Sequence, residues 1–273
     1  MHFPALNKEN IMSEEKKIGE VRMVVEDHIA VISVDNVAKL NSFSPEMLEQ
    51  LGRHLTTVND DDDIWVAVLC PEGEHTTAGL DMPKFFGPAA TVKPFPKDVV
   101  DPFGLYKRCT KPVISVVHGK TYTVGIEMML AGDLVIAADT AVFCQMESKR
   151  GIAPLGGAHF RYLTRTGWGN AMYHLFLCDE FDAQRALEIG FVQEVHPFGK
   201  HKERAMEIAR QICKNAPIGL RAAKAAALKF VQDGEQAAID CIPEIQKTVF
   251  ATEDFLEGLR SFAERRPASF EGR

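Results

Sequence analysis

The sequence predicts an α/β fold of stacked strand–strand–helix units that ends in a helical C-terminal region. Short β-rich runs alternate with helical segments in the N-terminal part of the chain, and helical spacing then continues almost to the end. No close sequence repeat is visible, but the order of the elements recurs. We therefore expect residues 1–19 to be a disordered N-terminal extension, 20–198 to form the core, and 199–273 to form helices that cap the core or join subunits.

Length and composition narrow the class of protein. A chain of 273 residues with 46% hydrophobic residues is long and apolar enough for one packed core. The net charge of −7 and the lack of a long basic run argue against a nucleic-acid scaffold. No apolar run approaches the ~20 residues of a membrane helix. The six cysteines form no CxxC pair and no zinc spacing, which favours buried reduced thiols, no metal site and a cytoplasmic location.

The individual elements are predicted from β-rich runs and helix-start signals. Val21–Val25 and Ile29–Val34 indicate a hairpin. Ser44, Pro45 and Glu46 supply a cap, a proline at the first helical position and an acid at the positive helix end, so a helix is expected from there to about residue 58. The further expected strands are Ile64–Leu69, Val113–Val117, Leu134–Ala138, Val142–Gln145 and Phe191–Val195, and the further helices are Val124–Leu130, Ala205–Lys214, Ile218–Val231, Ala237–Ala251 and Glu253–Arg265.

Three connections between these elements have distinct compositions. Glu72–Asp81 is polar and contains glycine, so it is expected to be a loop. Gly87–Pro102 contains four prolines and cannot form a regular helix or a central strand, so we expect a long surface loop that borders a site. Gly119–Thr123 is expected to be a turn between a strand and a helix.

Two glutamates carry the strongest chemical signal. Glu127 and Glu147 both lie among apolar neighbours, where burial disfavours the ionised carboxylate and raises its pKa toward neutrality. Two such groups in one cleft could add or remove water, or shift a double bond, at neutral pH. The alternative is that Glu127 only favours the N-terminus of its helix and that Glu147 pairs with Lys149 or Arg150 at the surface.

Two backbone amides are candidates for an oxyanion hole. The first N–H groups of a helix lack partners within it, so the Val124 N–H is available to a developing negative charge. Ala78 and Gly79 are small enough for a ligand to approach the backbone, which makes the Leu80 N–H the second candidate. The alternative for this loop is a tight connection in which Asp81 caps a short helix.

Together these segments resemble the enoyl-CoA hydratase/isomerase (crotonase) superfamily. The resemblance covers nearly the whole chain after about residue 20, and its motifs occur in the family's order. The matching positions are Lys39-Leu40-Asn41, Ala78-Gly79-Leu80-Asp81-Met82, Gly125-Ile126-Glu127, Asp133, Phe143, Gln145, Glu147, Gly151, Pro154, Gly156-Gly157, Gly190-Phe191-Val192, Glu253-Asp254, Glu257-Gly258, Phe262 and Arg265-Arg266-Pro267.

The resemblance implies a crotonase-like spiral of ββα units that binds acyl-coenzyme A thioesters and assembles as a homotrimer or a dimer of trimers. The amides of Leu80 and Val124 would hold the thioester oxygen as it becomes an enolate. The position matching Glu127 activates water to attack C3, and the position matching Glu147 delivers a proton to C2. Isomerases often keep only the latter, so the presence of both favours hydration. The resemblance implies no metal or redox cofactor, because coenzyme A is part of the substrate.

Some positions depart from the family's pattern and leave other reactions open. Many relatives carry glycine at Thr123 and Val124, and alanine at Leu80, so the short crotonyl substrate is not implied. The alternatives are an isomerase, another enolate-forming lyase or hydrolase, and a catalytically silent CoA-binding assembly protein, against which both glutamates argue. We expect the loop 87–102 to set acyl specificity. The residues expected to contact the substrate are Lys39, Leu40, Ala78, Gly79, Asp81, Met82, Tyr122 and Pro154.

Overall fold

A six-stranded sheet forms the centre of the molecule. The computed structural model describes residues 19–86, 88, 90 and 94–273, so all of the expected extension except its last residue lies outside the described residues. The strand order is β1-β2-β3-β4-β6-β9, in which β1 and β2 are antiparallel and every other pair is parallel. The strands are β1 (Glu20–Glu26), β2 (Ile29–Asp35), β3 (Val66–Pro71), β4 (Val113–Val117), β6 (Leu134–Ala138) and β9 (Glu194–His196).

A second, three-stranded sheet shows why the chain forms a spiral. Its order is β5-β7-β8, with β5 (Lys120–Tyr122), β7 (Val142–Cys144) and β8 (Phe181–Asp182). β4 and β6 lie in the large sheet, while β5 and β7, which follow them along the chain, lie in the small one. The pairs β4–β5 and β6–β7 therefore each give their first strand to the large sheet and their second strand to the small one. The turn expected at 119–123 is wrong over 120–122, because this segment pairs with β7, which no local pattern reveals.

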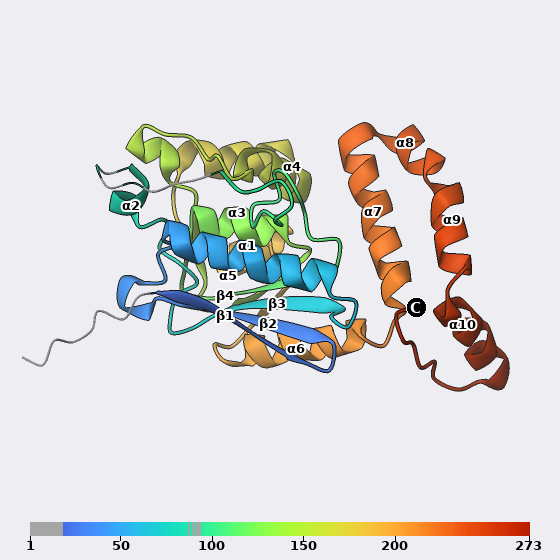
Figure 1. The fold of residues 1–273 in the computed structure, drawn as a ribbon. Helices are drawn as coiled ribbons and strands as arrows, with labels where there is room; N and C mark the ends of the chain where they lie inside the picture. The colour runs from blue at the N-terminus through green and yellow to red at the C-terminus, as the bar shows by residue number, and fades with distance from the viewer. Residues whose placement is uncertain (1–18, 87, 89, 91–93) are drawn as a thin grey trace, which may run out of the picture.

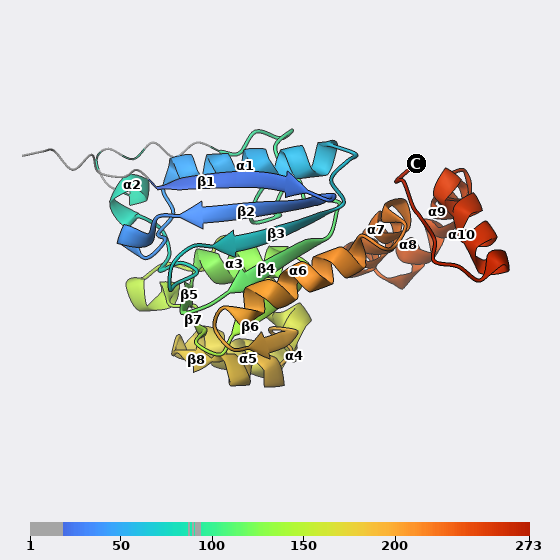
Figure 2. The same cartoon turned by 90° about the horizontal axis from the view of Figure 1, so that it is seen from below.

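Helices cover both faces of the large sheet. Figures 1 and 2 show α1 (Pro45–Asp60) and α3 (Val124–Ala131) on one face and α6 (Lys200–Ile212) on the other. The Ser44 hydroxyl accepts from the Met47 amide, so the predicted cap of α1 is confirmed. The remaining helical elements on this part of the chain are η1 (Val37–Lys39), α2 (Met82–Phe86), η2 (Glu147–Arg150), α4 (Ala158–Leu177) and α5 (Ala183–Glu188).

The helical region that stands apart from the sheet begins later than residue 199. Ala205 and Ala209 of α6 are fully buried against Val66 and Ile114, so α6 is a layer of the core. The helices after it form a separate group beside the sheet (Figure 1), which Lys224 anchors through a 2.6 Å ion pair with Asp133. They are α7 (Pro217–Asp233), α8 (Glu235–Asp240), α9 (Ile242–Phe250) and α10 (Glu253–Glu264).

These last helices expose several large apolar side chains. Phe262 is 86% exposed, and other large apolar side chains of the same helices are also exposed. Exposed apolar patches of this kind are typical of surfaces that another chain covers. The exposed side chains are Phe230, Val231, Ile239, Ile242, Phe250, Leu256, Leu259 and Phe262. Among the described residues, no helix is long and apolar enough to cross a membrane.

Two buried histidines predict a loss of stability in acid. His118 and His201 are fully buried, and His118 Nδ1 lies 3.1 Å from His201 Nε2. The Gly199 amide donates to His201 Nδ1, so Nε2 carries the proton and donates to His118. Burial is the main cause that lowers the pKa of His118 to about 3 and that of His201 to about 4, from an ordinary 6.5.

We therefore expect the free energy of unfolding to fall as the pH drops from about 6.5 toward about 4. The unfolded chain binds protons at these histidines in that range and the folded chain does not, so acid favours the unfolded state. Urea unfolding of the wild type at neutral pH and at about pH 5 measures this loss. His201→Gln keeps a donor toward His118 but does not titrate, so its loss should be smaller. An equal loss of unfolding free energy in the wild type and in His201→Gln would show that the buried histidine pair does not cause it.

Candidate active site

The groups expected to carry chemistry follow three neighbouring parallel segments. Thr77 pairs in parallel with Thr121 of β5, and Thr121 pairs in parallel with Phe143 of β7. Parallel segments end at the same edge, so the residues that follow them meet there, as in ligand crevices at the carboxyl ends of strands. The three continuations are the loop 78–81, helix α3 and the 3-10 helix η2. This edge therefore brings together both candidate amides and both glutamates.

The two candidate amides are free of protein acceptors within the part of the chain that the structure describes. The Phe43 amide donates to Gly79 O at 2.9 Å, and the Asp81 amide donates to Phe43 O at 2.8 Å. Phe43 therefore bonds to the residues before and after Leu80, namely to the Gly79 carbonyl and the Asp81 amide. Because successive backbone groups point to opposite sides, the Leu80 N–H points away from Phe43. Val124 is the first residue of α3, where an amide has no partner within the helix.

Glu127 is held by backbone amides in a buried position. Its side chain is 2% exposed, and Oε1 accepts from the amides of Gly156 at 2.6 Å and Ala158 at 3.3 Å. Burial raises its pKa to about 7, and the nearby Glu147 carboxylate adds to this, while the two amides oppose it. The carboxyl group is thus fixed by one oxygen and titrates near neutrality.

Glu147 is buried with one oxygen unpaired. It is 9% exposed, Oε1 accepts from Gln145 Nε2 at 2.7 Å, and Oε2 has no partner among the described residues. Burial raises the pKa of this carboxyl group above its ordinary value. The alternative of a surface ion pair is not what the structure contains, because Lys149 instead pairs with Asp179 at 2.8 Å. Burial therefore favours the protonated form of both carboxyl groups, and the pKa of Glu127 lies near neutral pH.

A model of the enoyl-CoA hydratase/isomerase family matches residues 25–273 of this sequence. The chain belongs to that family. The match includes both glutamates and both candidate amides, and it extends through the C-terminal helices. The resemblance that the motifs indicate is therefore confirmed.

Individual relatives agree with the family assignment. Enoyl-CoA hydratase EchA19 from Mycobacterium tuberculosis is 28% identical over 255 residues, which are 90% of this chain and 94% of that protein. Hydroxycinnamoyl-CoA hydratase-lyase from Pseudomonas fluorescens is 30% identical over 210 residues, which are 75% of this chain and 76% of that protein. The crystal structure of a probable enoyl-CoA hydratase/isomerase from Mycobacterium abscessus superimposes with a TM-score of 0.88 at 38% identity, covering 93% of this chain and 98% of that one. The predicted crotonase-like fold is confirmed.

Several expected substrate contacts of this hydratase/isomerase family member lie together beside the Leu80 amide. Lys39 Nζ forms a 2.7 Å ion pair with Asp81 Oδ2, although the lysine side chain is 57% exposed. The Ala78 amide donates to Leu40 O at 2.9 Å, which joins the loop 78–81 to the residues after η1. Lys39, Leu40, Ala78 and Asp81 therefore form one rim of the site.

The other expected contacts are more scattered. Tyr122 is 8% exposed and its hydroxyl donates to Glu180, so this hydroxyl is already engaged within the protein. Met82 is 45% exposed at the start of α2, and Pro154 is half-buried in the loop between η2 and α4. Among the described residues, no group of His, Cys, Asp or Glu is arranged to hold a metal ion.

Arg161 is a site residue that the sequence interpretation missed. Its guanidinium is buried and donates to Gly156 O at 3.0 Å and to Gly104 O at 3.1 Å. It therefore joins the loop that binds Glu127 to the loop that carries Phe103. The arginine lies in the first turns of α4, but its bonds depend on where residues 101–105 fold, and no local pattern predicts that.

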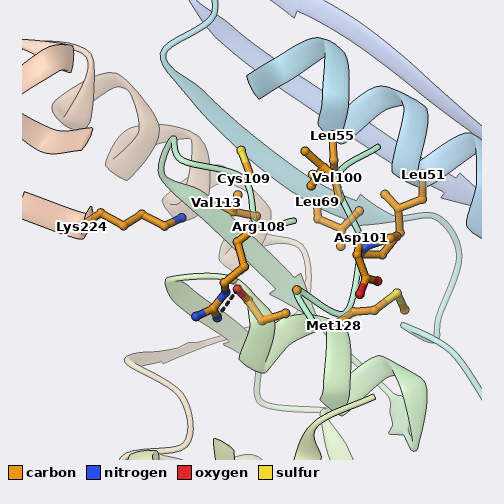
Figure 3. A pocket seen from close by; sticks show the side chains of 14 residues that line it. Leu51, Leu55, Leu69, Val100, Asp101, Arg108, Cys109, Val113, Met128 and Lys224 are labelled. Atoms are coloured by element: carbon orange, nitrogen blue, oxygen red, sulfur yellow. Dashed lines mark hydrogen bonds between the residues drawn. The ribbon is translucent and has the colours of Figure 1, made fainter. Parts of the chain in front are cut away.

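Two of the hollows in the described part of the chain lie beside α1. One lies between α1, β3 and α3 (Figure 3), where apolar side chains are accompanied by Arg108, which donates to Ala131 O at 2.8 Å. The other lies between α1 and the segment 94–99, which is a described part of the proline-rich loop. The side chains labelled in Figure 3 are Leu51, Leu55, Leu69, Val100, Asp101, Arg108, Cys109, Val113, Met128 and Lys224.

Proposed function

We propose that this family member is an enoyl-CoA hydratase, which adds water across the 2,3 double bond of an acyl-CoA thioester. The observation that carries the proposal is the meeting of two buried glutamates of raised pKa with two unpaired amides. The family match and the names of the relatives support an acyl-CoA substrate. The presence of both glutamates favours hydration over isomerisation, for which one carboxyl group suffices.

In the proposed mechanism, the amides of Leu80 and Val124 donate to the thioester oxygen, where negative charge develops. Glu127 takes a proton from water as the water oxygen bonds to C3. The electron pair of the double bond moves onto the thioester carbonyl, which gives an enolate. Glu147 then gives its proton to C2, and the carbonyl re-forms. Fixed dipoles suit this charge because they need no reorganisation during the reaction.

The charge states of the two carboxyl groups determine the pH dependence. Glu127 must be ionised to accept a proton, and its pKa lies at about 7. Glu147 must be protonated to donate, and burial favours that form. We therefore expect kcat/KM to rise as the pH rises through about 7, when measured under conditions in which the protein stays folded. A rate independent of pH between about 6 and 8 would contradict the role of Glu127 as base.

Two further features of the function are proposals of the same kind. Catalysis requires no metal or redox cofactor in this mechanism, because proton transfer and amide dipoles perform each step. The exposed apolar side chains of α7–α10 support assembly as a homotrimer or a dimer of trimers. Sedimentation or light scattering of the purified protein measures that state directly.

A spectrophotometric assay with 2-enoyl-CoA thioesters of several chain lengths tests the proposed activity. Loss of enoyl absorbance with formation of 3-hydroxyacyl-CoA is the expected result. A shifted double bond would instead identify an isomerase. Cleavage into a shorter acyl-CoA and an aldehyde would identify a lyase, a class that the name of the Pseudomonas relative brings into consideration. Thermal stabilisation by coenzyme A without turnover of any thioester would identify a catalytically silent binding protein.

A further inference from the structure

Thr123 has a backbone conformation that glycine adopts far more easily. Its φ is 47° and its ψ is −112°, immediately before α3. For a β-branched residue, positive φ places the side chain against the backbone, so this conformation is strained. Thr123 also occupies the N-cap position, where a threonine usually accepts a hydrogen bond from the helix, yet its side chain makes no such bond. Helix capping therefore does not explain a threonine here.

The strained turn is held from several sides. The Tyr122 amide donates to Thr77 O at 3.1 Å, and the Thr123 amide donates to Cys144 O at 3.0 Å. The Tyr122 hydroxyl donates to the Glu180 carboxylate, which is far away in the sequence. Strained conformations persist where surrounding contacts fix them, and they concentrate at functional sites. These bonds fix the backbone that leads directly into Val124.

The Thr123 side chain contacts the other oxyanion loop. A Cβ atom placed on Gly79 would lie 2.8 Å from Thr123 Oγ1, so the hydroxyl lies against the Gly79 backbone and leaves no room for a side chain there. Gly79 also has positive φ, at 118°. The residues that follow the two contacting positions are Leu80 and Val124, whose amides are the candidate donors. The contact thus joins the two loops at the residues that directly precede the two donor amides.

We propose that Thr123 is a positioning residue of the oxyanion hole, whose strained turn and hydroxyl contact with Gly79 set the separation of the Leu80 and Val124 amides. The inference rests on the proposed role of these two amides, and it deepens that role by naming what holds them in place. Chemically, fixed donors stabilise an enolate only if they lie where the oxygen charge develops. A contact between the two loops provides that constraint without touching the substrate.

Three substitutions separate the parts of this proposal. Thr123→Ser keeps the oxygen that touches Gly79, and Thr123→Ala removes it, so this pair differs chiefly in the contact. Thr123→Gly removes the contact and also relieves the backbone strain. We expect Thr123→Ser to keep kcat within about twofold, and Thr123→Ala to lower it about tenfold with KM little changed, less than the ~10²–10³-fold for losing a whole oxyanion donor. Thr123→Gly should raise Tm by a few degrees while lowering kcat at least as far as Thr123→Ala.

A binding measurement makes the test independent of hydration. Acetoacetyl-CoA forms an enolate that places negative charge on the thioester oxygen, whereas butyryl-CoA, of equal carbon number, stays neutral. Calorimetry of the wild type should show tighter binding of acetoacetyl-CoA, and Thr123→Ala should reduce that preference severalfold while Thr123→Ser keeps it. If the wild type hydrates no thioester but this pattern holds, the proposed hydratase activity fails and the positioning role stands. Equal kcat and equal preference in the serine and alanine variants would overturn the positioning role.

Discussion

Replacing either Glu127 or Glu147 by glutamine is expected to lower kcat by about 10²–10⁴-fold, the usual contribution of a positioned acid or base. Glutamine has nearly the shape of glutamate but neither accepts nor donates a proton in this role. At position 127 the amide oxygen can still accept from the Gly156 N–H, so the local structure should persist. At position 147 one oxygen remains to face Gln145. The loss should therefore reflect proton transfer rather than unfolding.

The measurement needs both a rate and a binding constant. We expect the dissociation constant of butyryl-CoA to change little in either variant, since neither carboxyl group is needed for the neutral ligand. Glu203→Gln is a suitable control, because Glu203 is an exposed partner of Lys200 on α6, which covers the other face of the large sheet (Figure 1). Wild-type hydration rates in both Glu127→Gln and Glu147→Gln would show that the proton-transfer roles are wrong. If Glu127→Gln shifts double bonds but does not hydrate, Glu147 alone supports isomerisation.

The elements that local chemistry determines could be predicted from the sequence. Ser44 caps α1 as expected, and Val113–Val117 is a buried strand with the predicted bounds. The strand β5 was missed because three residues carry little periodicity and its pairing partners are distant in the sequence. The helix expected at 237–251 is interrupted at Cys241, before the proline that lies in the first turn of α9.

The site residues that could be predicted are those whose neighbours in the sequence already indicate their environment. Glu127 and Glu147 were found because each lies among apolar residues, and the structure buries both. The partners that hold them were not found, because the Gly156 amide and the Arg161 guanidinium reach the site only through loop folding. The surface pairing of Glu147 that local charge suggests is absent, since Lys149 extends toward Asp179 instead.

Gly156→Ala is expected to lower kcat by about 10²-fold, the usual effect of misplacing a reacting group by about an ångström. A Cβ atom on Gly156 would lie 2.5 Å from Glu127 Oε2, 2.7 Å from Glu127 Cδ and 2.7 Å from Phe103 Cδ1. These separations are too short for unbonded atoms, so the carboxyl group or the loop must move. Gly156 does not have positive φ, so the effect comes from the clash and not from backbone strain.

Comparing the loss of kcat in Gly156→Ala with its loss of stability tests how precisely the Glu127 carboxyl group must be placed. Gly219→Ala is the matched control, because Gly219 lies in α7 and an added Cβ there meets nothing within 4 Å. We expect Gly219→Ala to keep wild-type kcat, and Gly156→Ala to lose activity while remaining folded by circular dichroism. Because the Gly156 amide also opposes the raised pKa of Glu127, a displaced carboxyl group should move the acid limb of the pH profile upward. Wild-type kcat and an unmoved limb in Gly156→Ala would mean that the close contact between this glycine and the carboxyl group has no part in the reaction.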